Sequence, residues 1–142
     1  MPLSRYFRRV CSVELSPRLV YIAHANFRDN GVENVSIVQM DCMQFSKAVL
    51  EGHGKASAMF RSFDFEFVLV DPPRAGLDPA SLRLISRFDN IVYISCMHET
   101  LREALGHLHP TYRIVSFRVF DHFPYTKYAE CVVHLKRRRE GE

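Results

Sequence analysis

The chain has 142 residues, with 19 lysines and arginines against 16 aspartates and glutamates and a net charge of +3. A composition of 47% hydrophobic and 25% charged residues is typical of a folded globular domain, and it excludes a disordered, collagen-like or coiled-coil chain. No apolar run of about 18 residues is present, which excludes a membrane-spanning helix. The first ten residues lack an apolar core, so we expect no signal peptide. This length fits one domain.

Strands and helices alternate from the start of the chain. Residues 9–14 (RVCSVE) predict a strand that ends on Glu14. Ser16 and Pro17 are typical of the cap and the first position of a helix. The spacing of apolar residues extends this helix to a stop at Gly31. Residues 35–40 predict a second strand, which runs into Asp41 and a short helix over 42–50.

The second half continues the alternation. Residues 51–62 (EGHGKASAMFRS) contain two glycines and little periodicity, which predicts a loop. Residues 65–70 (FEFVLV) form a nearly continuous apolar run, which is typical of a parallel strand covered on both faces. The remaining elements expected are a helix over 79–87, a strand over 91–95, a helix over 99–108, and strands over 113–120 and 131–136.

This order of elements predicts a doubly wound α/β fold. Ligands of such folds bind at the carboxyl ends of the strands. Four residues suited to binding or catalysis come directly after predicted strands, namely Glu14, Asp41, Asp71 and Cys96. We therefore expect these four residues at one edge of the sheet.

Carboxylates end two consecutive strands, at Glu14 and Asp41. In this position a carboxylate can accept hydrogen bonds from ribose hydroxyls or from an adenine amino group. Two solvated acids at the starts of loops would give the same sequence. Position alone does not decide between these two interpretations.

The tetrapeptide Asp71-Pro72-Pro73-Arg74 is a more specific signal. Its two prolines fix φ and remove two hydrogen-bond donors, which makes a stiff, extended corner directly after a buried strand. Such a corner can hold Asp71 and the neighbouring carbonyls toward a planar base. The alternative is a plain turn that ends a strand.

Cys96 follows one predicted strand and precedes a predicted helix. A thiol near a helix N-terminus has a lowered pKa because the helix dipole favours the thiolate. The alternative for a free cysteine is a small buried hydrophobe. His98 is a poor candidate for a base that activates Cys96, because side chains so close in sequence rarely reach that geometry. The remaining cysteines have no zinc-site or disulfide spacing, and we expect no metal; they are Cys11, Cys42 and Cys131.

Two features near the C-terminus have ordinary explanations when taken alone. Glu130, at the start of the last predicted strand, would be a surface acid. The basic run at 136–139 (KRRR) is either a solvated tail or an arm that contacts phosphates.

Four blocks of the sequence resemble the tRNA (uracil-5-)-methyltransferase family. They are residues 68–78 (VLVDPPRAGLD), 94–101 (ISCMHETL), 121–126 (DHFPYT) and 129–131 (AEC). Their order and spacing match those of the family, and the resemblance covers roughly residues 8–135. The resemblance implies a Rossmann-like class I methyltransferase sheet with helices on both faces. It also implies transfer of a methyl group from S-adenosylmethionine to C5 of a uridine in RNA, with tRNA as the expected substrate.

This reaction needs a nucleophile and a base. Uracil C5 is too weak a nucleophile to attack a methyl sulfonium, so a thiolate must first add to C6. A base must then remove the C5 proton so that the thiol can leave. The resemblance assigns Cys96 as the nucleophile and Glu130 as the base.

The resemblance also implies a binding site for each reactant. The target uridine, turned out of its RNA loop, would face the corner that contains Asp71, Pro72 and Arg74. Asp71 would also face the cofactor. Glu14 would bind the ribose of S-adenosylmethionine, and Asp41 would lie near its adenine.

The chain departs from the family in two places. Met97 and His98 stand where the family usually has Asn-Pro after the nucleophile. The strand and the glycine-rich cofactor loop that usually precede the strand ending at Glu14 are absent, since only residues 1–8 come before it. In this fold the absent strand is central. It would lie between the strand that ends at Glu14 and the strand that runs into Asp71.

We therefore interpret residues 1–142 as one truncated methyltransferase domain that acts on RNA uridine C5 through Cys96 and Glu130. The alternative is a non-catalytic remnant that binds RNA or a partner chain. Proteins rarely leave a central strand edge bare, which favours closure of the sheet, a homodimer, or a partner chain that supplies the missing strand. We expect a cytoplasmic location.

Overall fold

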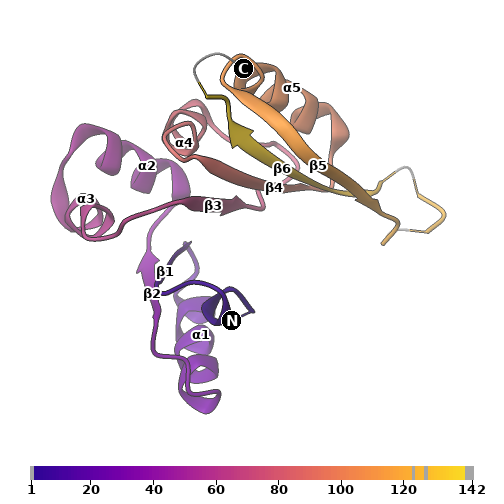
Figure 1. Cartoon of the computed structure of the whole chain (residues 1–142). Coiled ribbons are helices and arrows are strands. Elements are labelled where there is room, and N and C mark those ends of the chain that lie inside the picture. The colour runs from indigo at the N-terminus through magenta and orange to yellow at the C-terminus, as the bar shows by residue number, and fades with distance from the viewer. Residues whose placement is uncertain (1, 123, 127, 140–142) are drawn as a thin grey trace. The chain divides into compact units, whose positions relative to one another are not determined.

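The computed structural model describes residues 2–122, 124–126 and 128–139. Phe123, which is part of the 121–126 motif, lies outside the described residues. The chain divides into two compact units, Met1–Asp64 and Phe65–Glu142. Each unit has its own sheet (Figure 1).

The first unit has a two-stranded parallel sheet, in which Val10 pairs with Val35 and Glu14 pairs with Gln39. Its elements in chain order are a short 3-10 helix η1 (Pro2–Arg5), β1 (Val10–Glu14), α1 (Pro17–Asp29), β2 (Val35–Gln39), α2 (Cys42–Glu51) and α3 (Gly54–Arg61).

The predicted start and end of α1 are confirmed. The Ser16 hydroxyl oxygen accepts a hydrogen bond from the Leu19 N–H at 3.4 Å, and Pro17 is the first helical residue. Gly31 follows the helix with φ +61°, a left-handed conformation that glycine adopts without a steric cost. Local sequence signals are therefore enough to set both ends of this helix.

The predicted loop over 51–62 is wrong, because α3 occupies most of it. Gly52 and Gly54 have φ of +80° and +71°, so the two glycines make the break between α2 and α3. Ala56 and Ser57 are buried, and α3 packs against α2. Burial of one helix face here outweighs the weak periodicity that favours a loop.

The second unit has a four-stranded mixed sheet with the strand order β3-β4-β6-β5. Strands β3 and β4 are parallel, and β6 is antiparallel to both of its neighbours. The elements are β3 (Phe67–Val70), α4 (Pro79–Ile85), β4 (Asn90–Ser95), α5 (His98–Leu108), β5 (Tyr112–Phe120) and β6 (Glu130–Arg137). The α/β class predicted from the sequence, in the form of a truncated Rossmann-like fold, is confirmed.

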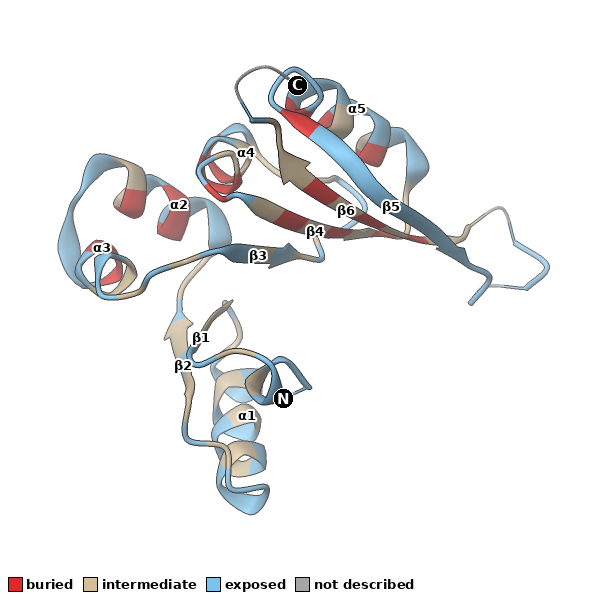
Figure 2. Ribbon diagram, viewed as in Figure 1, coloured by how far each residue is buried: buried red, intermediate tan, exposed pale blue. Residues whose placement is uncertain are grey.

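The main core lies on one face of this sheet. Alternate residues of β4 and β6 are almost fully buried, and they pack against one side of α5 and the end of α4 (Figure 2). The residues between them in the strands are only half-buried. The central members of the core are Ile91, Tyr93, Val133, Leu135, Leu101 and Leu108.

The predicted coverage of β3 on both faces is wrong. Phe67 and Leu69 are 37% and 44% exposed, whereas Val68 and Val70 pack against the core. β3 stands at the edge of its sheet, and its alternate side chains project away from the core-facing side. An apolar run therefore predicts the strand correctly but not what covers it.

The basic run at the C-terminus is partly structural, so a purely solvated tail is the wrong interpretation for Arg137. Its Nη2 donates to the carbonyl oxygen of Ser86 at 2.6 Å and to the hydroxyl of Tyr112 at 2.9 Å. Its Nε donates to Asp89 at 3.2 Å. The hydroxyl of buried Tyr112 donates to the Phe88 carbonyl at 2.6 Å. Arg137 thus joins the turn after α4 to the start of β5.

We predict that Arg137→Ala lowers the free energy of unfolding by about 1–3 kcal/mol, because the part-buried carbonyls of Ser86 and Phe88 lose a charged donor. Arg139→Ala is the matched control, since Arg139 belongs to the same run and is exposed. It should change the free energy of unfolding by less than about 0.5 kcal/mol. Urea denaturation measures both. Equal effects of the two substitutions would contradict the structural role of Arg137.

Candidate active site

The loop from Asp71 to Asp78 joins β3 to α4. Asp71 and Arg74 are exposed, and Pro72 is half-buried. The Gly76 N–H donates to the Pro73 carbonyl oxygen at 2.8 Å, which closes a tight turn. The stiff corner predicted from the prolines is therefore closed by a backbone hydrogen bond as well.

Arg74 of this corner contacts the segment before β6. Its guanidinium carbon lies 4.5 Å from the centre of the Tyr128 ring, within the range of a cation–π interaction. Tyr128 comes two residues before Glu130. The corner is thus linked to the chain that leads into the predicted base.

Cys96 occupies a short turn between β4 and α5, and it is half-exposed. The hydroxyl of Ser95 donates to the Met97 carbonyl oxygen at 2.9 Å and accepts from the Met97 N–H at 3.1 Å. Ser95 itself is only 4% exposed. The buried side chain of the residue before the thiol therefore holds the backbone of the residue after it.

The antiparallel register of β4 and β6 brings two predicted catalytic residues together. Ser95 pairs with Cys131, the last pair at this end of the two strands. Cys96 directly follows Ser95, and Glu130 directly precedes Cys131. The nucleophile and the base predicted from the sequence therefore stand at the same end of adjacent strands.

The parallel pairing of β3 with β4 adds the corner to this end of the sheet. Val70, the last residue of β3, pairs with Tyr93 of β4. Because parallel strands have their carboxyl ends on the same side of the sheet, Asp71 after β3 lies at the same end of the sheet as Cys96 after β4. Asp71, Cys96 and Glu130 thus come together from three consecutive strands of the sheet.

Two of the other cysteines, Cys11 and Cys131, have raised pKa values. Burial raises the pKa of Cys11 to about 11, although Arg9 opposes the shift. Burial and the charge of Glu130 both raise the pKa of Cys131. These two thiols are therefore protonated near neutral pH. His98 lies 3.2 Å from the Glu99 carboxylate on the exposed start of α5.

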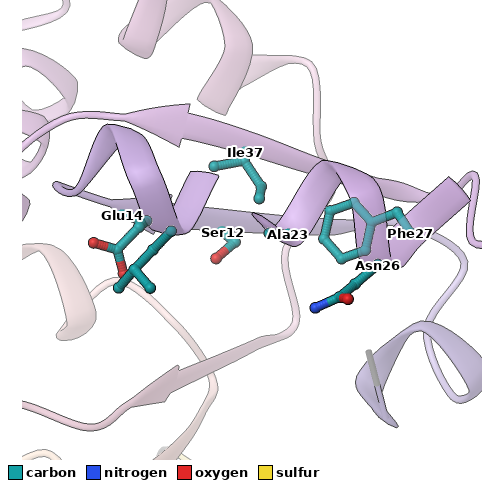
Figure 3. A pocket seen from close by; sticks show the side chains of 7 residues that line it. Ser12, Glu14, Ala23, Asn26, Phe27 and Ile37 are labelled. Atoms are coloured by element: carbon teal, nitrogen blue, oxygen red, sulfur yellow. The ribbon is translucent and has the colours of Figure 1, made fainter. Parts of the chain in front are cut away.

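In the first unit, Glu14 lines a hollow of about 290 Å³. Figure 3 shows its carboxylate near one end, with Ser12 beside it and Asn26 and Phe27 further along. One carboxylate oxygen of Glu14, Oε1, accepts from the Ser16 N–H at 2.7 Å. Glu14 therefore orients the start of α1 and presents its carboxylate to the hollow.

Asp41 is the N-cap of α2. Its Oδ1 accepts from the backbone N–H groups of Met43 and Gln44, at 2.9 and 3.1 Å. Because β1 and β2 are parallel, Glu14, the last residue of β1, and Asp41, two residues after β2, lie at the same end of the sheet. Two of the three residues predicted to contact the cofactor, Glu14 and Asp41, are thus neighbours within the first unit, whereas Asp71 belongs to the second.

Asp78 caps α4 in the same way, with Oδ1 accepting from the N–H groups of Ala80 and Ser81. Burial alone would raise the pKa of Asp78. Hydrogen bonds from the Ser81 hydroxyl and from the two backbone N–H groups outweigh burial, and the pKa is lowered. The acid that ends the DPPRAGLD motif therefore fixes the helix that follows the corner.

Sequence reasoning missed the side chains that support the site. Ser95, Thr100 and Tyr128 were not predicted to act, yet each contacts the corner or the turn that holds Cys96. Only Ser95 gives a local signal, since a serine hydroxyl often accepts a hydrogen bond from the backbone N–H two residues later. The other two contacts join segments far apart in the sequence.

Among the described residues, no group of three or more His, Cys, Asp or Glu side chains could hold a metal ion. No helix in the described part of the chain combines the length and apolar character needed to cross a membrane.

A family model described as tRNA (Uracil-5-)-methyltransferase matches residues 1–138. The chain belongs to this family. Its relatives include the tRNA/tmRNA (uracil-C(5))-methyltransferases of Cellvibrio japonicus and Idiomarina loihiensis, which are 45% and 42% identical over 97% of the chain. The chain spans 38% of the length of each of these two relatives.

Solved structures of methyltransferases have the same fold. The tRNA (uracil-54, C5)-methyltransferase of Pyrococcus abyssi, solved with S-adenosyl-L-homocysteine, is 27% identical with a TM-score of 0.71. The match covers 94% of our chain and 30% of the Pyrococcus abyssi chain. An rRNA methylase of Streptococcus thermophilus is only 8% identical, with a TM-score of 0.60 over 92% of this chain and 74% of that one. That second likeness shows the fold alone.

We predict that Asp41→Ala lowers the free energy of unfolding of the first unit by about 1 kcal/mol, because α2 loses its cap. Asp41→Asn is the control, since asparagine caps helices as well as aspartate does but carries no charge. It should leave stability nearly unchanged. Chemical denaturation followed by circular dichroism measures both variants. A larger loss with Asn than with Ala would argue against the capping role.

The stability that Asp78 contributes should depend on pH. Its pKa is lowered in the folded chain, so this stabilisation is present above the ordinary carboxyl pKa of 3.8 and is lost as pH falls through the lowered value. Asp78→Ala should therefore lower the free energy of unfolding by about 1 kcal/mol at pH 7. The difference from the wild type should shrink below pH 4. A difference that stays constant down to pH 3 would contradict this account.

Proposed function

We propose that this chain carries the nucleophile and the base of an RNA uridine C5 methyltransferase, with tRNA as substrate and S-adenosylmethionine as methyl donor. The observation that carries the proposal is the register of β4 with β6, which sets Cys96 beside Glu130 at one end of the sheet. The family and the names of the relatives support the choice of reaction. We propose that both units belong to one methyltransferase domain and that it acts in the cytoplasm, on RNA.

The two residues would act in sequence on the uracil ring. The Cys96 thiolate forms a bond from Sγ to C6, and the electron pair of the C5–C6 double bond moves toward O4. C5 becomes nucleophilic and would take the methyl group from the sulfonium of S-adenosylmethionine, with the methyl–sulfur bond breaking and its electron pair staying on sulfur. The Glu130 carboxylate then removes the C5 proton. The released electron pair restores the C5–C6 double bond, the bond from Sγ to C6 breaks, and the thiolate is regenerated.

The corner at Asp71–Arg74 would hold the uracil ring in place for this attack. Asp71 stands at the same end of the sheet as Cys96, and its carboxylate can accept hydrogen bonds from a uracil N–H. Pro72 keeps the backbone extended, and Arg74 is anchored by its contact with Tyr128. A rigid corner of this kind favours a planar base in one orientation.

The first unit has acceptors suited to the cofactor. Glu14 uses Oε1 for the Ser16 N–H, and Asp41 uses Oδ1 for two backbone N–H groups. Each carboxylate has a second oxygen, and carboxylates after parallel strands accept from ribose hydroxyls and adenine amino groups. The hollow beside Glu14 is also partly polar in lining, with Ser12 and Asn26. S-adenosylmethionine, when bound, supplies an electrophilic methyl group.

The strand edges favour a second candidate function, in which the chain binds RNA or a partner chain without catalysis. β1 stands at one edge of its sheet and β3 at one edge of the other. Exposed strand edges accept further strands by backbone hydrogen bonds. A second copy or a partner chain would then supply a strand. Light scattering separates a monomer from a homodimer, and titration calorimetry tests whether the chain alone binds S-adenosylmethionine.

We predict that RNA containing 5-fluorouridine forms a denaturation-resistant adduct with this chain in the presence of S-adenosylmethionine. Fluorine at C5 cannot be removed as a proton, so the bond between Sγ and C6 persists. Cys96→Ser should abolish the adduct, whereas Cys42→Ser, at an exposed cysteine of α2, should retain it. Gel electrophoresis with labelled RNA measures the adduct.

Glu130→Gln should form the first bond but not complete the reaction on ordinary uridine RNA. Turnover should fall about 10²–10⁴-fold, as for loss of a general base, and the covalent intermediate should accumulate. A folded wild-type chain that gives no adduct would overturn catalysis by this chain and favour the non-catalytic function.

A further inference from the structure

The carbonyl oxygen of Met97 is the centre of the turn that holds Cys96. It accepts from the Ser95 hydroxyl at 2.9 Å, the Leu101 N–H at 3.1 Å and the Thr100 hydroxyl at 3.3 Å. The Leu101 bond is the first of α5, and the Ser95 bond comes from the buried end of β4. The turn is therefore fixed from the strand on one side and from the helix on the other.

Thr100 also reaches across to the other predicted loop. Its hydroxyl lies 3.3 Å from the carbonyl oxygen of Arg74, 26 residues away in the sequence. The same hydroxyl is thus shared between Met97 in the Cys96 turn and Arg74 in the corner. A threonine hydroxyl in a helix often contacts the carbonyl three residues earlier, so the Met97 contact alone is ordinary. The Arg74 contact is not local.

Gly76 brings the two loops into contact at this point. A Cβ at Gly76 would lie 3.1 Å from the Cβ of Thr100, which is too close without movement. Gly76 also has φ +78°, a conformation that side chains with a Cβ rarely adopt. The absence of a side chain at Gly76 therefore sets how closely the corner approaches the first turn of α5.

We propose that Thr100 is a positioning residue that sets the distance between the Cys96 thiol and the uracil ring held by the Asp71 corner. This inference rests on the proposed function. Nucleophilic attack requires the reacting atoms to be held about 3–3.5 Å apart, and a displacement of about 1 Å can cost about 100-fold in rate. The turn after β4 carries the thiol, and the Asp71 corner would hold the uracil. The Thr100 hydroxyl, shared between these two loops, therefore controls that separation.

Thr100→Val and Thr100→Ser form a matched pair for the test. Valine keeps the shape of threonine and removes the hydroxyl, whereas serine keeps the hydroxyl. With RNA containing 5-fluorouridine, Thr100→Val should slow adduct formation at saturating RNA by about 10–100-fold, with little change in the RNA concentration at half saturation. Thr100→Ser should restore most of the rate. Thermal melting checks that both variants fold.

A second measurement does not depend on catalysis. Peptide-resolved mass spectrometry follows the alkylation of Cys96 by iodoacetamide across a range of pH, with Cys42 on α2 as the internal control. Thr100→Val should raise the rate at Cys96 severalfold, because the turn is freed from the corner, and leave Cys42 unchanged. Thr100→Ser should match the wild type.

The two measurements separate failure of the inference from failure of the proposed function. If the wild type forms no adduct, the proposed catalysis fails and the alkylation profiles decide the role of Thr100. If Thr100→Val matches the wild type in adduct rate and in alkylation profile, the inference is overturned while the proposed function stands. Equal losses in Thr100→Val and Thr100→Ser would also overturn it, since the hydroxyl would then not be the feature that matters.

Discussion

The candidate active site depends on one backbone constraint, the antiparallel register of β4 with β6. The pair Ser95–Cys131 ends that ladder, and the residues just outside it are Cys96 and Glu130. A shift of one residue would turn every side chain of β6 to the opposite face. It would expose Val133 and Leu135, which are almost fully buried. The hydrophobic core therefore fixes the register, and the register places the two residues proposed to act on uracil.

Short polar contacts then hold the loops that leave this framework. Ser95 binds both backbone groups of Met97, and Asp78 caps the helix that follows the corner. Each contact satisfies backbone groups that would otherwise be left open at the end of a strand or helix. The same arrangement recurs at Asp41 in the first unit. Short side chains at the ends of strands and at the starts of helices thus fix the loops between them.

The two sheets have consequences for how the chain works. β1, which ends at Glu14, and β3, which precedes Asp71, both stand at sheet edges. β3 exposes Phe67 and Leu69. The chain matches 38% of the length of its relatives. The residues proposed for bond making on uracil lie in the second unit, whereas Glu14 and Asp41, proposed for the cofactor, lie in the first.

The sequence by itself determined the α/β class, nearly all of the helices and strands, and the family, because these depend on local periodicity, capping residues and four short motifs. It failed at α3, where packing against α2 outweighs two glycines, and at β3, whose apolar residues are partly exposed. Only the tertiary structure decided that Arg137 is structural and that Thr100 joins two loops. Each of these contacts links residues at least 26 positions apart, and no local pattern encodes which distant carbonyl a side chain will reach.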